Sequence, residues 1–263
     1  MQNDIPISLK AHQLSVGYKT GKSEIPVAAG LNFEVHRGEL VGIVGVNGIG
    51  KSTLLRTLGV FQEPLNGTLT LNDKPLAAHS VRELSKIISV VLTEPLSTRN
   101  MTVAELIALG RQPYTNWIGS LSRDDRNSIN EVIQHMDLNL LRDRKCYELS
   151  DGQLQKVLIA RALAQDTDLL LLDEPTTHLD LYHKVQILKT LQSIAHSSQK
   201  MIIYTTHELD LAIQLCDRIL IIGQENHYFG EPCELIARKN FDSLFPSDLI
   251  QFDGNSGTFK VQK

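Results

Sequence analysis

A short glycine-rich segment, GVNGIGKS at residues 45–52, constrains this chain more than any other feature of its sequence. It matches the phosphate-binding pattern G-x-x-x-x-G-K-[ST] and lies between an apolar run at residues 39–44 and a segment of helical character at residues 52–60. Its glycines let successive backbone N–H groups and the helix N-terminus face an anion. Lys51 would reach the β and γ phosphates, and the hydroxyl of Ser52 would bind Mg²⁺. A glycine-rich turn without a ligand is the alternative, which the strand, loop and helix order disfavours.

Two carboxylates follow a second apolar run, LLLLDE at residues 169–174. An open α/β sheet places its chemistry at such strand ends. Because neighbouring strand residues point to opposite faces, Asp173 and Glu174 should have different roles. We assign Asp173 to the Mg²⁺ shell and Glu174 to the attacking water, as general base or orienter. Taken alone they could equally cap a turn before Pro175, but the phosphate-binding loop favours the catalytic interpretation.

A third segment, ELSDGQ at residues 148–153, begins a predicted helix. Ser150 and Gln153 form an S-x-x-Q capping box, which leaves further N–H groups at the helix terminus available to an anion. A capping box alone starts many helices. Ser122 and Asp125 form a second capping box ahead of another amphipathic segment.

These segments, followed by TTH, occur in the order that characterises the ATP-binding cassette (ABC) family, and the chain resembles that family. The family signature LSGGQ is LSDGQ here. The resemblance extends from about Leu14 to about Glu234. It includes an aromatic A-loop residue, Tyr18, a D-loop at Thr177–Asp180 and a switch histidine, His207.

The resemblance implies an α/β fold, a P-loop NTPase nucleotide-binding domain of the ABC type with a β-rich subdomain and a helical insert. It also implies a homodimer that encloses two ATP molecules. Ser150 and Gly152 of one subunit would contact the γ-phosphate held by Lys51 of the other.

By the same resemblance, Tyr18 would stack on adenine, and His207 would contact the γ-phosphate or hold Glu174 in place. His178, His183 and His196 are expected to be surface or loop residues. The expected nucleotide-binding set comprises Tyr18, Gly45, Asn47, Gly48, Gly50, Lys51, Ser52, Thr53, Ser150, Gly152, Gln153 and Asp180.

The chain departs from the family pattern at three positions. Ile49 replaces a small residue, and Asp151 replaces the second signature glycine, where its charge should repel the γ-phosphate. The Q-loop glutamine is absent, and the chain reads Thr93, Glu94 and Pro95. Thr93 occupies the equivalent position and could supply an oxygen to Mg²⁺ or water, so it joins the expected metal and catalytic residues.

Composition agrees with a single large ATPase domain. The chain has 263 residues and 42% hydrophobic content, enough for one large core, and its net charge of −4 gives no general attraction to nucleic acid. Cys146, Cys216 and Cys233 are widely separated, as expected of unpaired thiols in a reducing compartment. The N-terminus has Asp4, Pro6 and Lys10 where a signal peptide would be apolar. Because no apolar run approaches ~20 residues, a transport role would need a separate membrane partner.

The ATPase domain is expected at residues 7–235, with a helical insert at about 80–164 and a short C-terminal extension at 236–263. The domain begins β-rich, with turns expected at Gly17, Gly38, Asn66 and Gly67. Strands then alternate with helices, which favours a largely parallel sheet. Residues 252–263 predict a small hairpin or frayed tail.

Residues 101–117 resemble a segment of importer cassettes that serve iron-siderophore, haem and cobalamin uptake. In that group a groove beside the Q-loop receives a short helix of the membrane subunit. Tyr114 and Trp117 could line such a groove or could simply pack between helices. The resemblance implies an ATPase subunit at the cytoplasmic face of the cell membrane, bound to a multi-span permease and indirectly served by a substrate-binding protein. Iron-siderophore import is the preferred cargo class, with haem or cobalamin as alternatives.

A soluble ABC ATPase without a transport role is the alternative of a different class. Such proteins would normally show long insertions, tandem cassettes or basic arms, which this sequence lacks. A regulatory module without hydrolysis would lack the catalytic carboxylate, yet Glu174 is present.

Overall fold

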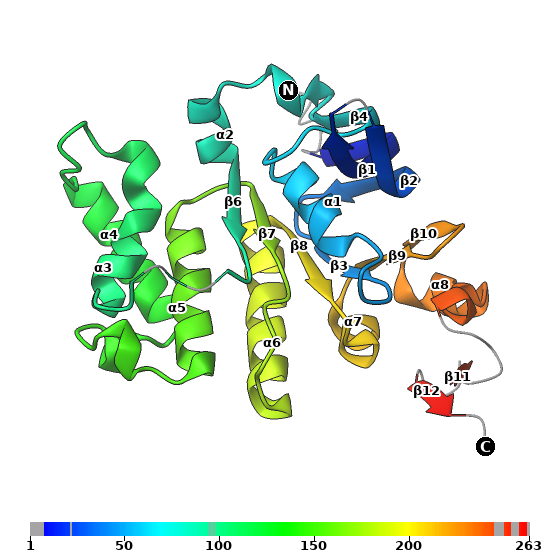
Figure 1. Ribbon diagram of the computed structural model, residues 1–263. Coiled ribbons are helices and arrows are strands. Elements are labelled where there is room, and N and C mark those ends of the chain that lie inside the picture. Colours follow the sequence, from blue (N-terminus) through cyan, green and yellow to red (C-terminus); the bar gives the residue numbers. More distant parts are fainter. Residues whose placement is uncertain are drawn as a thin grey trace, which may run out of the picture.

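A six-stranded sheet with the strand order β10-β9-β3-β8-β7-β6 forms the centre of the molecule (Figure 1). The structure, a computed structural model, describes residues 8–21, 23–94, 96, 98–244, 250–253 and 258–261. The central strands are β3 (Leu40–Val44), β6 (Ile88–Val91), β7 (Leu169–Leu172), β8 (Met201–Thr206), β9 (Arg218–Ile222) and β10 (His227–Gly230). All pair in parallel except β10, which is antiparallel to β9. The expected parallel α/β sheet is therefore confirmed, and its carboxyl edge gathers the ends of β3, β7 and β8.

Four strands from the first part of the chain form an antiparallel sheet with the order β2-β1-β4-β5. Its strands are β1 (Ser8–Thr20), β2 (Ser23–His36), β4 (Asn66–Leu71) and β5 (Lys74–Pro75). The turn expected at Gly38 is confirmed, whereas Asn66 and Gly67 begin β4 instead of forming a turn. The turn expected at Gly17 is also wrong, because Gly17 lies within β1 at a register shift against β2. A Cβ atom there would lie 2.1 Å from the carbonyl oxygen of Ile25, so the glycine permits close approach of two strands.

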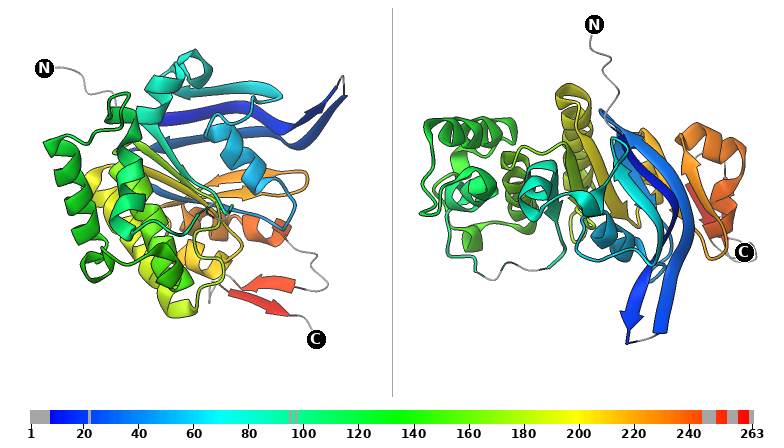
Figure 2. Two further views of the ribbon diagram at one scale, coloured as in Figure 1. Left: turned by 60° about the vertical axis from the view of Figure 1, so that its left-hand side comes forward. Right: turned by 90° about the horizontal axis from the view of Figure 1, so that it is seen from above.

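Helices pack on the central sheet, and further helices lie beyond its β6 edge (Figures 1 and 2). They are α1 (Lys51–Leu58), α2 (Val81–Ile87), α3 (Val103–Ala108), α4 (Arg123–His135), α5 (Asp151–Ala164), α6 (Leu181–Ser198), α7 (Leu209–Leu215) and α8 (Pro232–Ala237). Short 3-10 helices are η1 (Leu76–Ala78), η2 (Leu109–Tyr114), η3 (Asn139–Leu141), η4 (Cys146–Glu148) and η5 (Asn240–Leu244).

The helical segment formed by α3, η2, α4 and α5 lies beside β6, far from α8 and β10 at the opposite edge (Figure 2). A buried ion pair fixes its helices to one another, since Arg111 Nε lies 2.8 Å from Asp125 Oδ1 and Arg111 also donates to the carbonyl oxygen of Ala164. The range 80–164 also contains β6, a strand of the central sheet. The part without central strands therefore begins after Val91.

Two hydrophobic cores lie on opposite faces of the central sheet, and β7 contributes to both. Leu169 and Leu171 pack in the core beneath the antiparallel sheet and α1, whereas Leu170 and Leu172 pack in the core beneath the other helices. This alternation follows from the two-residue period of a strand and explains the uninterrupted run of leucines before Asp173.

The C-terminal residues that the structure describes form the expected hairpin, in which β11 (Ile250–Asp253) pairs antiparallel with β12 (Thr258–Val261). Ile7, the expected first residue of the domain, and Pro95 of the Q-loop lie outside the described residues. All three cysteines are unpaired, as expected. Among the described helices, none combines the length and the apolar character that a membrane span requires.

Candidate functional site

The phosphate-binding loop joins β3 to α1 at the carboxyl edge of the central sheet. Gly48 and Gly50 have φ values of 79° and 111°, a left-handed region that favours glycine. A Cβ atom at Gly50 would lie 2.5 Å from a methyl carbon of Val27, so a side chain there would displace the neighbouring strand. The N-terminal N–H groups of α1, which have no intrahelical partners, thus open onto the loop.

Lys51 is only 6% exposed and folds back over its own loop. Its Nζ donates to the carbonyl oxygens of Gly45 and Val46, at 2.8 and 3.3 Å. Burial lowers the pKa of the Lys51 ammonium, while the carboxylates of Glu174 and Asp173 act in the opposite direction. A poorly hydrated cation in this position is well suited to bind an anion that enters the loop.

A cavity of about 500 Å³ lies over the loop. Its lining residues are Tyr18, Val27, Asn47, Gly48, Gly50, Lys51, Ser52, Thr53, Glu174 and His207. Tyr18 is 54% exposed, and its phenol oxygen lies 3.0 Å from Thr53 Oγ1, which anchors the ring at the cavity. Gly45 does not line the cavity and instead contributes the carbonyl that binds Lys51.

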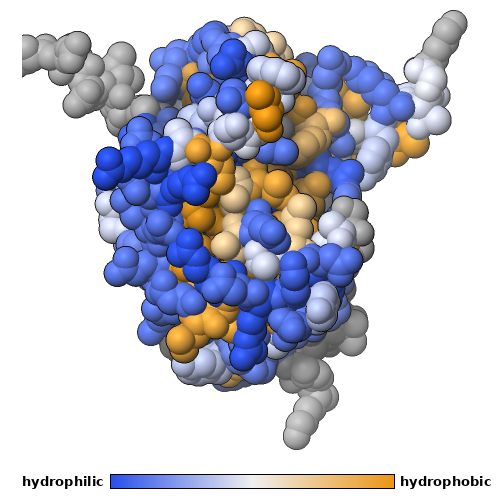
Figure 3. Space-filling model, turned by 90° about the vertical axis from the view of Figure 1, so that its left-hand side faces the viewer, coloured by the Kyte–Doolittle hydropathy of each residue, from blue (hydrophilic) through white to orange (hydrophobic). Residues whose placement is uncertain are grey.

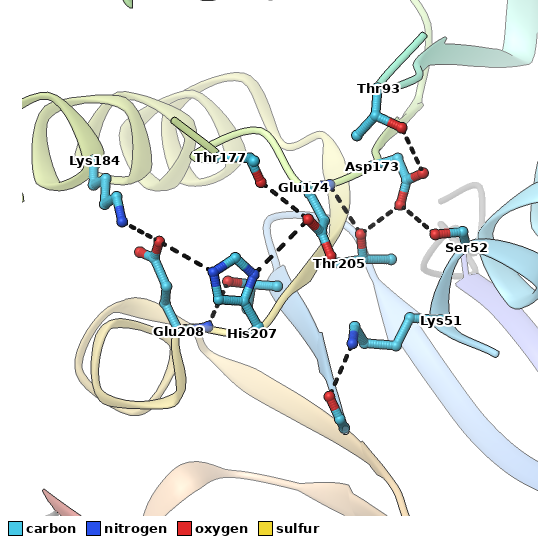
Figure 4. A network of polar contacts seen from close by, with 12 residues as sticks. Lys51, Ser52, Thr93, Asp173, Glu174, Thr177, Lys184, Thr205, His207 and Glu208 are labelled. Carbon is cyan, nitrogen blue, oxygen red and sulfur yellow. Dashed lines mark hydrogen bonds and ion pairs between the residues drawn. The ribbon is translucent and has the colours of Figure 1, made fainter. Parts of the chain in front are cut away.

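Asp173 is buried, and its carboxylate accepts hydrogen bonds from three hydroxyl groups (Figure 4). Ser52 donates to its Oδ1 at 3.0 Å and Thr205 donates to the same oxygen at 2.7 Å. Thr93 donates to Oδ2 at 3.5 Å. A carboxylate surrounded by hydroxyl oxygens suits a hard cation such as Mg²⁺, with phosphate oxygens and water to complete its coordination.

Glu174 has other side-chain partners, but β7 ends at Leu172, so the expected alternation of strand faces does not apply to it. Its backbone has a φ of 46°, and its N–H donates to Thr205 Oγ1 at 2.9 Å. Thr177 donates to Glu174 Oε2 at 3.0 Å. The carboxylates of Asp173 and Glu174 therefore have separate side-chain partners, which supports a division between metal binding and water activation.

His207 follows β8 and lies between two carboxylates (Figure 4). Its Nδ1 is 3.8 Å from Glu174 Oε2, and its Nε2 is 3.9 Å from Glu208 Oε1. Glu208 in turn pairs with Lys184 of α6 at 2.5 Å. His207 also lines the cavity, so one ring can contact both Glu174 and a ligand phosphate.

The two Q-loop residues that the structure describes point in different directions. Thr93 faces Asp173, whereas Glu94 forms an ion pair with Arg56 of α1 at 2.7 Å. Glu94 is 66% exposed at its side chain, so its charge lies in solvent and next to a cation. This arrangement favours Thr93 over Glu94 as the group that assists Mg²⁺ or water.

The signature residues lie at the start of α5, away from the cavity. Ser150 accepts a hydrogen bond from the N–H of Gln153 at 3.3 Å, and its own N–H donates to Gln153 Oε1 at 3.1 Å, which confirms the capping box. Ser150, Gly152 and Gln153 are not among the residues that line the cavity. Asp151 instead lines a second groove, which also includes Thr93.

Asp180 likewise lies outside the cavity lining. It caps α6, where its Oδ1 accepts from the N–H of His183 at 2.9 Å and its carboxylate lies 2.8 Å from His183 Nδ1. The hydrogen bond from the His183 N–H lowers the pKa of Asp180. His178 and His196 are exposed and His183 is partly exposed, as expected of surface residues.

The aromatic residues expected beside the Q-loop do not line the groove there. Tyr114 packs on Arg111, whose guanidinium carbon lies 3.9 Å from the ring centre. Trp117 is 94% exposed. The groove lining contains leucines, including Leu92 and Leu154, in place of these aromatics. Packing, the simpler of the two interpretations, therefore holds for Tyr114.

Three residues of the polar network escaped the sequence analysis: Thr205, Lys184 and Glu208. Thr205 lies beside Asp173 because parallel pairing of Leu172 with Tyr204 brings the residues that follow them together, a register that no local motif encodes. No local pattern connects Lys184 of α6 with Glu208, which directly precedes α7.

Comparison with known proteins gives matches along most of the chain. A profile of the ABC transporter family matches residues 28–177. An ABC transporter ATP-binding protein of Methanocaldococcus jannaschii is 36% identical over 97% of this chain and 87% of its own length. The iron(3+)-hydroxamate import ATP-binding protein FhuC of Bacillus subtilis is 35% identical over 78% of this chain and 75% of its own length.

Solved structures give a similar result. A transporter assigned to the metal-chelate ABC type, in an inward-facing conformation, superposes with a TM-score of 0.78 at 28% identity. The alignment covers 91% of this chain and 89% of that chain.

Proposed function

The chain belongs to the ABC transporter family, and on that premise we propose that it is the ATP-hydrolysing subunit of an importer for iron-siderophore complexes. Proteins of this family bind and hydrolyse ATP. The cargo assignment rests on the similarity to the iron(3+)-hydroxamate import protein along most of the chain. The structural relative of the metal-chelate type supports it.

We assign the chemistry to residues of the cavity. Lys51 binds the terminal phosphates, and the hydroxyl of Ser52 with Asp173 and Thr93 would hold Mg²⁺. When bound, Mg²⁺ would neutralise negative charge on the phosphates. Glu174 orients or deprotonates the attacking water, and His207 keeps Glu174 in position across 3.8 Å.

A homodimer completes this site in the proposal. Lys51 lines the cavity, whereas Ser150 and Gly152 lie outside its lining. An exposed capping serine at the start of α5 can supply its hydroxyl and nearby N–H groups to a phosphate held by a second copy. Each ATP would then lie between the loop of one chain and the signature of the other.

The proposed membrane partner is a multi-span permease on which the dimer rests at the cytoplasmic face. A groove of about 240 Å³ between β6 and α5 is lined by leucines and by Thr93, Glu94 and Asp173, so an inserted helix would contact catalytic residues directly. Seen from the side of the helical segment, apolar side chains gather in a hollow between hydrophilic surfaces (Figure 3). A substrate-binding protein would deliver the cargo to the permease.

Deletion of the gene in its host tests the cargo class. Uptake of labelled ferric siderophore should be lost while unrelated nutrients accumulate normally, and a copy with Lys51→Ala should fail to restore uptake. Loss of haem or cobalamin uptake alone would move the assignment to that cargo. Normal uptake of all three would exclude this class and favour an ATPase without such a transport role.

A further inference from the structure

The Thr205 side chain is fully buried at the carboxyl end of β8 and contacts both acidic residues of the site. Its Oγ1 donates to Asp173 Oδ1 at 2.7 Å and accepts from the Glu174 N–H at 2.9 Å (Figure 4). A hydroxyl has one proton, so these two bonds are compatible only in this direction. The rotation of the Thr205 hydroxyl is therefore fixed by its two neighbours.

The other hydroxyls at Asp173 have different surroundings. Ser52 lies in the first turn of α1 and lines the cavity, where its oxygen is available to a metal. Thr93 lies on the exposed Q-loop, with its Oγ1 3.5 Å from Asp173 Oδ2. Of the three, Thr205 alone also binds the backbone of Glu174. The Thr205 side chain is 0% exposed, so a ligand can bind in the cavity without displacing its hydroxyl group.

We propose that Thr205 is the positioning residue that fixes the Mg²⁺-binding carboxylate and the catalytic glutamate relative to each other. The hydrogen bond to Oδ1 orients Asp173 toward Ser52. The bond from the Glu174 N–H holds a backbone with a φ of 46°, a conformation that a glutamate rarely adopts without such support. This inference rests on the roles proposed above for Asp173 and Glu174.

Loss of the Thr205 hydroxyl should affect both acids at once. The Glu174 N–H would lose its acceptor in a partly buried position, and Asp173 would lose its shortest hydrogen bond. The free energy of a hydrogen bond to a charged group corresponds to a change in rate of about 10- to 100-fold. We expect Thr205→Val, which keeps the shape of the side chain, to lower kcat by about that factor.

The matched control is Thr167, a buried threonine just before β7, at the opposite end from Asp173. Its hydroxyl lies 2.9 Å from Ser89 Oγ and 3.1 Å from the carbonyl oxygen of Leu169, so Thr167→Val also removes a buried hydroxyl with two partners. This variant should lower the melting temperature as Thr205→Val does and leave kcat unchanged.

The experiment compares wild type, Thr205→Val, Thr205→Ser and Thr167→Val in two measurements. Steady-state ATPase assays give kcat and KM, and binding of a fluorescent ATP analogue is titrated with and without Mg²⁺. Thr205→Val should lower kcat and weaken the Mg²⁺ dependence of binding severalfold while metal-free binding is retained. Thr205→Ser, which keeps the hydroxyl, should recover most of both properties.

Wild-type kcat and Mg²⁺ dependence in Thr205→Val would overturn the proposal, as would an equal loss of kcat in Thr167→Val. A Glu174→Gln variant separates this failure from that of the proposed roles. If Glu174→Gln is inactive while Thr205→Val is normal, only the assignment of Thr205 fails. If Glu174→Gln retains full activity, the catalytic role of Glu174 fails first.

Discussion

The phosphate-binding side and the signature side of this chain are organised in different ways. At the carboxyl edge of the sheet, Asp173 and Glu174 have partners from segments distant in sequence, and both carboxylates act on Lys51 of the phosphate-binding loop. At the start of α5, by contrast, the hydrogen bonds of Ser150 are local: they go to Gln153 and Leu154, three and four residues away. One side is positioned by the tertiary fold of a single chain, while the other presents a locally capped helix end. In the proposed dimer, the first half of the site would form within one chain and the second would act on its partner.

The largest expected effect is on the preformed side. Glu174→Gln should lower ATP turnover by roughly 10²-fold or more, because general-base contributions are of that order, and should retain ATP binding. The amide keeps the shape of the side chain, so Thr177 can still donate to its oxygen. ATPase assays and nucleotide titration measure the two properties, and gel filtration should show an ATP-bound dimer. Turnover at the wild-type rate would remove Glu174 from the mechanism.

The signature side can be tested with two serines that both cap helices through capping boxes, Ser150 on α5 and Ser122 on α4. Each alanine substitution should lower stability by about 1 kcal/mol, the usual cost of a lost N-cap. Ser150→Ala should in addition lower ATPase activity about 10-fold, since it removes a phosphate ligand of the partner site. Equal activities in the two variants would show that Ser150 is only a helix cap.

At the Q-loop, between the two sides, we expect a smaller effect. Thr93→Ala should lower ATPase activity severalfold, whereas Glu94→Ala should change it little. Thr93 contacts Asp173, and the exposed Glu94–Arg56 pair contributes only about 0–1 kcal/mol. Steady-state assays compare the two variants at equal stability. The opposite order of activities would assign the metal or coupling function to Glu94.

The smallest effect concerns the acid in the signature. Asp151→Asn should raise turnover about twofold at low salt, because it removes a negative charge from the end that faces the partner's phosphate. The gain should shrink as salt increases, since exposed charges are screened. ATPase assays across a salt series test this, and an unchanged rate at low salt would mean that the Asp151 carboxylate points away from the nucleotide.

Local motifs were predictable from the sequence because neighbouring residues create them. The phosphate-binding loop, the strand before Asp173 and the capping boxes at Ser150 and Ser122 are where the sequence indicated. The features that were missed depend on partners far away in sequence. Gly17 resembles a turn residue, but its small size serves close packing of β1 on β2.

Long-range register explains the remaining misses at the site. Thr205 contacts Asp173 because β8 pairs with β7, and the contact of Lys184 with Glu208 requires α6 and α7 to be adjacent. A single sequence contains no spacing rule that connects such residues. Tyr114 is a different case, since it packs on Arg111 of the same 3-10 helix, η2, three residues away.

The division of β7 between two cores has a consequence for hydrogen exchange. Leu169 and Leu171 are held on one face of the sheet, and Leu170 and Leu172 on the other. If either core opens locally, the other still retains the strand, so the β7 amides should exchange with solvent only when the whole domain unfolds. Asp173, which follows directly, would keep its position through partial openings that release the peripheral helices.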